Sequence, residues 1–359
     1  MRNNIIGKDY AISGLRVTAL LLVIWCHILE HVSMRVRWVG PIGNYFSVGV
    51  QIFLLLSGYL YGKKADVPKT PFVIRNVVKI LKDYYIHYAI FIIPLCLLLK
   101  EYTVNRWFLW RVLTGARTIG NEAHLWYIPY ILLCYLITPA LYDIREWMSR
   151  GRYLGLKLIG LIFLIEITFI TYDSYFIPAW ICCYVIGYFA PKLKEYYAGL
   201  FCRKVFVVVT LVSIVANGIK YVLVYVYGYG EEYLNLAIKD CSWQAQLLKQ
   251  CYHWSAILLA ITISGVVYAI LSHVRFRKKG KKILDICDKY SYDIYLCHML
   301  YVKGMLSTVF LTDSLILNLL ITFALIFINA VLLYYLCRPQ ELFALIKNNK
   351  RMKSEGKSG

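Results

Sequence analysis

The sequence predicts an all-α, polytopic integral membrane protein with about ten transmembrane helices and both termini in the cytoplasm. Three observations predict this class. Apolar residues make up 60% of the 359 positions. They form runs such as VFVVVTLVSIVANGIKYVLVYVYGY from Val205, which are long enough to cross a bilayer and exceed what a soluble core requires. The third observation is the uneven distribution of basic residues between successive loops.

The apolar runs define the expected spans in chain order, with each boundary at the end of a run. We expect spans at 11–31, 43–62, 84–99, 124–142, 158–172, 176–190, 205–227, 254–272, 291–311 and 315–337. The first run is too long for a cleavable signal peptide and contains Arg16. No linker or compositional break divides the chain, so we expect one membrane domain over 1–346 and a short basic cytoplasmic tail over 347–359.

The basic residues set the expected orientation. With the N-terminus inside, 29 of the 40 Lys and Arg residues fall in cytoplasmic segments and 8 fall in outer loops. This bias is typical of a membrane protein with both ends in the cytoplasm. It explains the net charge of +20 better than nucleic-acid binding does, so we expect no nucleic-acid partner.

The eleven cysteines show no CxxC pair with the spacing of metal ligands, so we expect no metal site. Most of them fall inside the predicted spans, where a thiol packs as a small apolar side chain. Cys241 and Cys251 share the longest outer loop and could form a disulfide if that compartment is oxidising.

Arg16 and His27 flank ten residues of almost unbroken apolar sequence, VTALLLVIWC. Eleven residues advance a helix by about 1100° and ~16 Å, which places both side chains on one stripe. Polar groups inside a span usually face a bundle interior or a wet cavity and indicate a reaction site or a pathway. Alternatively, Arg16 extends to the headgroups and His27 bonds a neighbouring helix.

Two clusters lie near the cytoplasmic ends of predicted spans. Ser57 and Gly58 interrupt an apolar helix, which indicates either space for a ligand or tight helix packing. Arg75, Lys79 and Lys82 recur at spacings of four and three before the third span. Such a cationic stripe suits the phosphates of a nucleotide-bearing donor, and it is equally typical of an inner-leaflet lipid anchor.

A third cluster, NEAHLWYIPY, begins the fourth span on its outer side with Glu122, His124, Trp126 and Tyr127. Aromatic side chains at this depth often form the interfacial belt, but their faces and a histidine would also suit a sugar ring.

The segment KYSYDIYLCHMLYVK places Ser291, Tyr295 and His298 at spacings of four and three, on one face of the ninth span. These polar groups are expected to point inward. They either line a site or form hydrogen bonds to a neighbouring helix.

Taken together, the chain resembles the acyltransferase family 3 integral membrane proteins. The resemblance is carried, in family order, by GLRVTALLLVIWCH, VGVQIFLLLSGYL, RNVVKILKDYYIHY, HLWYIPYILLCYL and SYDIYLCH, which cover nearly the whole chain. It implies the transfer of an acyl group, typically acetyl from cytoplasmic acetyl-CoA, to a hydroxyl of a surface carbohydrate. The implied location is a bacterial cytoplasmic membrane.

By this similarity, His27 is the expected catalytic histidine, Arg16 its partner on the acyl-CoA path, and Arg75 the basic position after the second span. Family members often show adjacent arginines and a Tyr-Pro step where this chain has IRNVVKILKDYY, so Lys79 and Lys82 are expected to share the phosphate contacts. The last helix ends in LCRPQ, where relatives often show a Glu-Lys-Pro pattern.

The residues themselves are compatible with this chemistry. A neutral His27 can take the proton of a sugar hydroxyl that attacks the thioester, and an acetyl-histidine intermediate is equally permitted. The expected partners are acyl-CoA, a carbohydrate acceptor that is surface-bound or lipid-linked, and membrane lipids, and the sequence leaves the oligomeric state open. The rival hypotheses are a transporter or flippase of lipid-linked sugars, supported by Glu166 in the fifth span, and a non-catalytic partner in envelope assembly.

Overall fold

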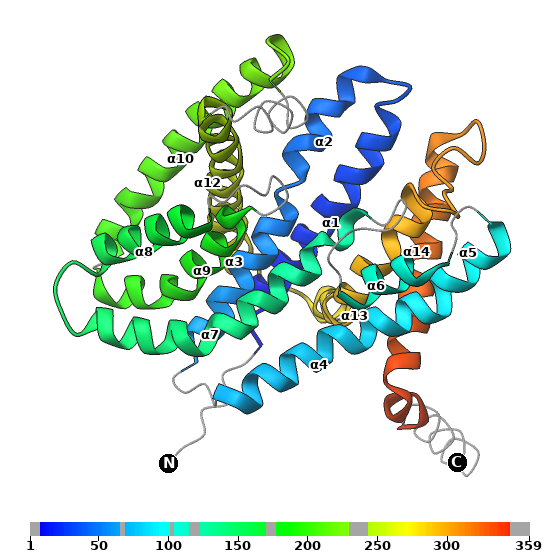
Figure 1. The fold of residues 1–359 in the computed structure, drawn as a ribbon, viewed down its shortest axis with the longest axis horizontal. Coiled ribbons are helices and arrows are strands. Elements are labelled where there is room, and N and C mark those ends of the chain that lie inside the picture. Colours follow the sequence, from blue (N-terminus) through cyan, green and yellow to red (C-terminus); the bar gives the residue numbers. More distant parts are fainter. Residues whose placement is uncertain are drawn as a thin grey trace. The chain divides into compact units, whose positions relative to one another are not determined.

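The computed structural model describes residues 8–64, 69–100, 104–114, 123–169, 177–197, 199–229 and 243–344, and every regular element in these ranges is helical (Figure 1). The all-α class predicted from the sequence is therefore confirmed. The contacts between residues divide the chain into two compact units, and each unit is made of two separate stretches of the sequence. Unit 1 comprises Met1–Val73 and Tyr130–Asp288, and unit 2 comprises Ile74–Pro129 and Lys289–Gly359.

Unit 1 is built on the first helix, which runs without interruption through the predicted first span. Asp9 caps it by accepting hydrogen bonds from the backbone N–H groups of Ala11 and Ile12 at 3.1 and 3.3 Å. The other elements of unit 1 follow. They are α1 (Tyr10–Val32), η1 (Arg37–Val39), α2 (Gly40–Phe46), α3 (Gly49–Gly62), most of α7 (Tyr127–Ser149), α8 (Leu154–Phe169), α9 (Pro178–Tyr196), α10 (Gly199–Tyr221), the π-helical η4 (Val222–Val226), α12 (Trp243–His273) and the first part of α13 (Lys278–Val302).

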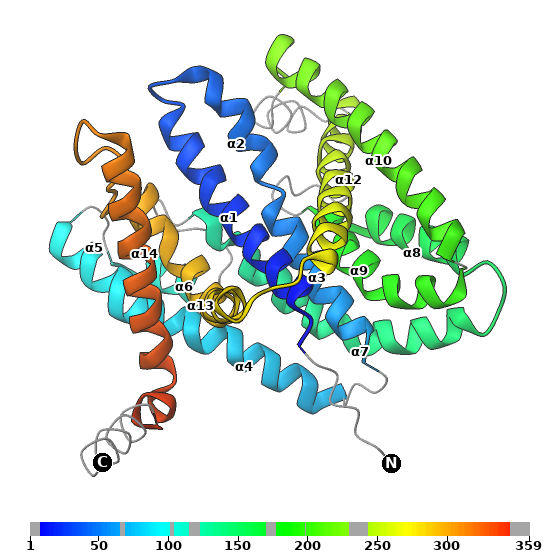
Figure 2. The same ribbon diagram turned by 180° about the vertical axis from the view of Figure 1, so that it is seen from behind.

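Helices α1, α3 and α12 share an apolar core made of small and aliphatic side chains. Its buried members are Ile12, Leu15, Ala19, Val48, Ile52, Leu56, Ala256 and Ala260. Helices α10 and α12 lie side by side in both views of the ribbon (Figures 1 and 2).

Helix α3 packs against α9 with backbone nearly touching backbone. A Cβ atom added at Gly58 would lie 2.1 Å from the carbonyl oxygen of Tyr184, and one added at Gly187 would lie 2.1 Å from that of Leu55. Only glycine permits such an approach. Of the two interpretations of the Ser57–Gly58 pair, the structure supports tight helix packing.

Unit 2 holds α4 from Ile74 onward, the π-helical η2 (Tyr88–Ile92), α5 (Ile93–Leu99), α6 (Arg106–Thr114), η3 (Ala123–Trp126), the start of α7, the second part of α13 and α14 (Leu315–Cys337). Helix α4 itself begins at Lys69 and ends at His87. Two tyrosine hydroxyls join α4 to α6, because Tyr84 donates to the carbonyl oxygen of Val112 (3.1 Å) and Tyr85 to that of Leu113 (2.7 Å).

Seven helical runs among the described residues are long and apolar enough to cross a membrane, which makes the chain a multi-pass membrane protein. They are Tyr10–Val32, Arg37–Gly62, Lys69–Leu99, His124–Ser149, Arg203–Val226, Gln244–His273 and Leu315–Cys337. Three of the ten predicted spans coincide with helices outside this set, because α8 has only 16 residues and because α9 and α13 carry several charges.

Several boundaries differ from those predicted, and the start of the third span and the end of the ninth are two of them. The third span was expected at 84–99, but the helical run extends back to Lys69, since an amphipathic basic segment can continue a helix without being apolar. The ninth was expected to reach residue 311, but α13 ends at Val302. The backbone N–H groups of Lys303 and Gly304 both bond the carbonyl oxygen of Met299, at 3.1 and 2.8 Å, and close the helix there.

Candidate functional site

Helix α1 carries both Arg16 and His27, as predicted, and each has an acidic neighbour. Arg16 Nη1 forms a very short ion pair with Asp288 Oδ1 at the end of unit 1. Ser13 donates to the other carboxylate oxygen of Asp288 at 3.0 Å, and Lys8 Nζ lies 3.1 Å from it. Arg16 is therefore anchored to α13 within unit 1.

Asp288 lies outside the predicted spans, and its charge state follows from these contacts. Burial acts to raise the pKa of Asp288, but the Arg16 charge and the hydrogen bonds from Lys8 and Ser13 outweigh it and lower that pKa below its ordinary value. The carboxylate is therefore ionised at neutral pH. Sequence reasoning missed Asp288, although the two aspartates in the otherwise basic segment KKILDICDKY were a usable signal.

His27 lies one turn from the end of α1 beside Glu30, a residue that sequence reasoning also missed. His27 Nδ1 is 3.3 Å from Glu30 Oε2, with 19% of the histidine side chain and 55% of the glutamate side chain exposed. When Nδ1 carries the proton, Glu30 accepts it in a hydrogen bond and Nε2 is left as the basic nitrogen. The i, i+3 spacing in HILE was the signal for this pair.

Helix α2 packs directly on the turn that carries His27. A Cβ atom added at Gly43 would lie 3.1 Å from Leu29 Cβ and 3.2 Å from the carbonyl oxygen of Cys26. The small residue lets α2 approach α1 closely, so the polar residues that follow Gly43 lie next to the histidine turn.

In unit 2, the structure brings together two clusters that the sequence placed far apart. The ring of His124 lies 4.6 Å from that of His298 and 5.2 Å from that of Tyr295, centroid to centroid, and Tyr127 lies 5.4 Å from Tyr295. Tyr295 donates a very short hydrogen bond from its hydroxyl to the backbone carbonyl oxygen of His124. All four side chains are buried.

The tautomer of His298 follows from its hydrogen bond. Its Nδ1–H donates to the carbonyl oxygen of Tyr295 at 2.6 Å, which leaves Nε2 as an acceptor in the neutral ring.

His87, which sequence reasoning missed, is fully buried, and its Nδ1 lies 3.9 Å from Cys297 Sγ. Trp126 and Ser57, both predicted site residues, are partly buried, and Ser291 is buried on α13.

The predicted cationic stripe lies on one continuous helix, α4, and its three side chains are exposed. Of the three, Lys82 makes a hydrogen bond to another helix, because its Nζ donates to the carbonyl oxygen of Cys337 at 2.9 Å. Lys82 is thus partly used to attach α14. Lys79 has the buried carboxyl group of Asp293 among its electrostatic neighbours.

Arg338, in the LCRPQ segment, has two buried acidic partners. Its Nη2 lies 2.5 Å from Asp83 Oδ2 and its Nη1 lies 3.8 Å from Asp293 Oδ1. Burial acts to lower the pKa of Arg338, but the charges of Asp83 and Asp293 outweigh it and raise that pKa. The segment that departs from the family pattern therefore contributes a structural ion-pair network in unit 2.

Glu166, the best sequence evidence for a transporter, is buried on α8. Trp254 donates its indole N–H to Glu166 Oε1 at 2.9 Å, so the carboxyl group joins α8 to α12. Glu122, Cys241 and the tail 347–359 lie outside the described residues, so the expected disulfide and tail stay predictions. Cys251 is exposed on α12.

The helices and their buried polar groups define a multi-pass membrane protein with ionisable groups in its helical units. Comparison with protein families identifies the class: the family described as "Acyltransferase domain", acyltransferase family 3, matches residues 9–338. The chain therefore belongs to acyltransferase family 3 and is a membrane acyltransferase. Comparison with curated proteins and with solved structures finds no match.

Proposed function

We propose that this protein transfers an acyl group, most simply acetyl, from cytoplasmic acyl-CoA to a hydroxyl of a cell-surface or lipid-linked carbohydrate. The observation that carries the proposal is the His27–Glu30 pair at the end of a membrane helix, in a chain of an acyltransferase family. The proposed topology has ten spans with both termini in the cytoplasm of a bacterial cell, supported by the excess of Lys and Arg in the corresponding loops.

In the proposed reaction, the acceptor hydroxyl oxygen attacks the thioester carbonyl carbon. His27 Nε2 takes the hydroxyl proton while Glu30 holds Nδ1–H, the carbon–sulfur bond breaks, and the proton passes to the departing thiolate. The products are the carbohydrate ester and CoA. Attack by His27 itself, followed by transfer from acyl-histidine, uses the same residue and stays an alternative route.

For the donor, we propose that Arg75, Lys79 and Lys82 bind its phosphates, because exposed cations at helical spacing can form charge-assisted hydrogen bonds to phosphate oxygens. Ser57 is proposed to contact the donor, and Arg16 to hold the donor path through its anchored position. For the acceptor, we propose the cluster of His124, Trp126, Tyr127, Tyr295 and His298, where aromatic faces and imidazole groups lie together.

The decisive experiment measures acyl transfer by the purified full-length protein, with the surface glycan of the source cell as acceptor and mass spectrometry as the readout. We expect His27→Ala to lose the acyl increment, and His273→Ala, an exposed histidine on α12, to retain it. We expect Arg75→Gln to raise the acyl-CoA concentration needed for half-maximal rate. Normal transfer by His27→Ala, in protein with unchanged thermal stability, would contradict the assignment.

A further inference from the structure

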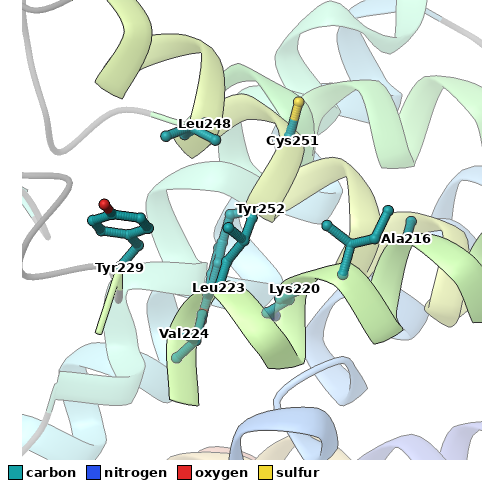
Figure 3. A pocket seen from close by; sticks show the side chains of 9 residues that line it. Ala216, Lys220, Leu223, Val224, Tyr229, Leu248, Cys251 and Tyr252 are labelled. Carbon is teal, nitrogen blue, oxygen red and sulfur yellow. The ribbon is translucent and has the colours of Figure 1, made fainter. Parts of the chain in front are cut away.

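A pocket of about 260 Å³ lies between α10 and α12 in unit 1, and none of the residues proposed for the reaction lines it (Figure 3). Its wall is mostly aliphatic, and Lys220, Tyr229 and Tyr252 are the lining residues that carry an amino or hydroxyl group. Pockets for drug-sized ligands begin at about 300 Å³. This one therefore suits a small headgroup and the first carbons of a chain better than an oligosaccharide.

Lys220 places a positive charge in this apolar wall. The residue is only 7% exposed, and its Nζ lies 3.8 Å from the ring centroid of Tyr252 and 5.7 Å from that of Tyr45. Lys220 lies six residues before Val226, the last residue of its membrane span, which is about 9 Å along the helix at ~1.5 Å per residue. Aromatic faces stabilise a cation at such a depth, and a charge kept within a span indicates a functional site.

The two rings that contact Lys220 are themselves held in place. Tyr252 donates from its hydroxyl to Asn44 Oδ1 at 3.1 Å, and Tyr45 donates to the carbonyl oxygen of Asn217 at 2.8 Å. Asn44 in turn donates to the Tyr225 hydroxyl at 3.0 Å. Hydrogen bonds behind the aliphatic wall therefore fix the rings against which Lys220 packs.

The network connects the pocket to the His27 turn. Asn44 and Tyr45 follow Gly43, the residue at which α2 packs on Cys26 and Leu29 of α1. A ligand whose headgroup reaches Lys220 would thus be linked through α2 to the helix that carries His27, within the same unit.

The pocket also adjoins a surface suited to lipid. Ile219 lines the pocket and is 56% exposed, and Val215 and Val226 on the same helical run are 61% and 66% exposed. Exposed aliphatic side chains on a membrane span face acyl chains. A lipid could therefore enter the pocket from the bilayer.

We propose that this pocket binds the phosphate of a lipid carrier to which the carbohydrate acceptor is attached. Lys220 would pair with the phosphate, and the aliphatic wall would hold the first part of the carrier chain. The identification of the ligand as the acceptor's carrier rests on the proposed function. The binding of a phosphate-headed lipid does not.

The test measures binding of a polyprenyl monophosphate to the detergent-solubilised full-length protein, without acyl-CoA, by native mass spectrometry and thermal shift. We expect Lys220→Gln to weaken binding about tenfold or more, the loss of one charge-assisted bond, and Lys220→Arg to retain most of it. Lys204→Gln, an exposed lysine on the same helix, should bind like the wild type. Melting without lipid shows whether each variant is folded.

Three outcomes would overturn the proposal: equal binding of an uncharged polyprenol, unchanged binding by a folded Lys220→Gln, or phosphatidylglycerol binding as tightly as the polyprenyl phosphate. The last would identify an ordinary anionic-lipid site. The proposed function is tested separately, because it would be contradicted if the wild-type protein showed no acyl transfer. Lipid binding is measured without any acyl donor and does not depend on that result.

Discussion

Replacing Glu30 with glutamine tests how far the chemistry of His27 depends on its acidic neighbour. A buried carboxylate that holds a catalytic imidazole can contribute about 10⁴ in kcat, whereas an exposed ion pair contributes about 0–1 kcal/mol. The 3.3 Å contact and the 55% exposure of Glu30 place this pair near the exposed limit. We therefore expect Glu30→Gln to lower kcat/KM for acyl transfer by about twofold to tenfold, or ~0.4–1.4 kcal/mol.

The assay is steady-state acyl transfer by the purified full-length protein at varied acyl-CoA concentration. His27→Ala should lose about 10²–10⁴, the contribution of a general base. A matched control exists on α9, where Glu195 forms an i, i+3 pair with Lys192 at 3.2 Å and has a 68% exposed side chain. Glu195→Gln should leave kcat/KM unchanged.

Two results would refute the reasoning about Glu30. A loss of 10³ or more would show that Glu30 itself exchanges a proton with the reactants. No loss at all, with His27→Ala inactive, would show that the imidazole is oriented by other groups.

Three further perturbations test the scaffold and the acceptor cluster. Gly58→Ala should destabilise the protein by about 3 kcal/mol, because the new Cβ atom would lie 2.1 Å from a backbone carbonyl oxygen of α9. The control is Gly218→Ala, whose new Cβ atom would have no neighbour within 4 Å. In a melting experiment this control should be neutral or slightly stabilising. Folding lowers the pKa of Asp288, so the stabilisation that its carboxylate provides is complete above the ordinary pKa of 3.8 and is lost as the pH falls through the lower pKa of the folded protein. Asp288→Asn should therefore melt at a lower temperature than the wild type at pH 6. On acidification, the variant should lose less stability than the wild type. His124→Ala combined with Trp126→Ala should raise the acceptor concentration for half-maximal transfer while slow acyl-CoA hydrolysis persists, and loss of donor use with normal acceptor dependence would move the carbohydrate site elsewhere.

Helical class and the placement of Arg16 and His27 on one helix could be predicted because both depend on local sequence. An apolar run of sufficient length forms a helix in a bilayer whatever its neighbours are. The start of the third run was predicted too late for a related reason. Hydropathy detects apolar residues, and the segment from Lys69 to Asp83 is helical but basic.

The meeting of His124 with Tyr295 and His298 could not be predicted, although each residue was a candidate. Spacing shows which side chains share a face of one helix, but which helices pack together depends on shape along their whole length. The ion pairs of Asp288 with Arg16 and of Asp83 with Arg338 were missed for the same reason, since the partners are distant in sequence. Glu30 is different, because its i, i+3 spacing from His27 could have been read directly.

The partners of each arginine indicate whether it holds the fold together or is a candidate for the functional site. Arg145 is 5% exposed and donates to the carbonyl oxygen of Gly62 at 2.7 Å, and Arg338 is paired with buried aspartates. Buried or partly buried cations with such partners hold helices together, because removing the partner would leave an uncompensated charge. Arg16 belongs with them through Asp288, so it would act on the donor chiefly by fixing the position of α1. Arg75 is exposed on α4 and forms no ion pair with the described residues, so it could bind a phosphate without breaking one, which makes it the better candidate for direct contact with the donor.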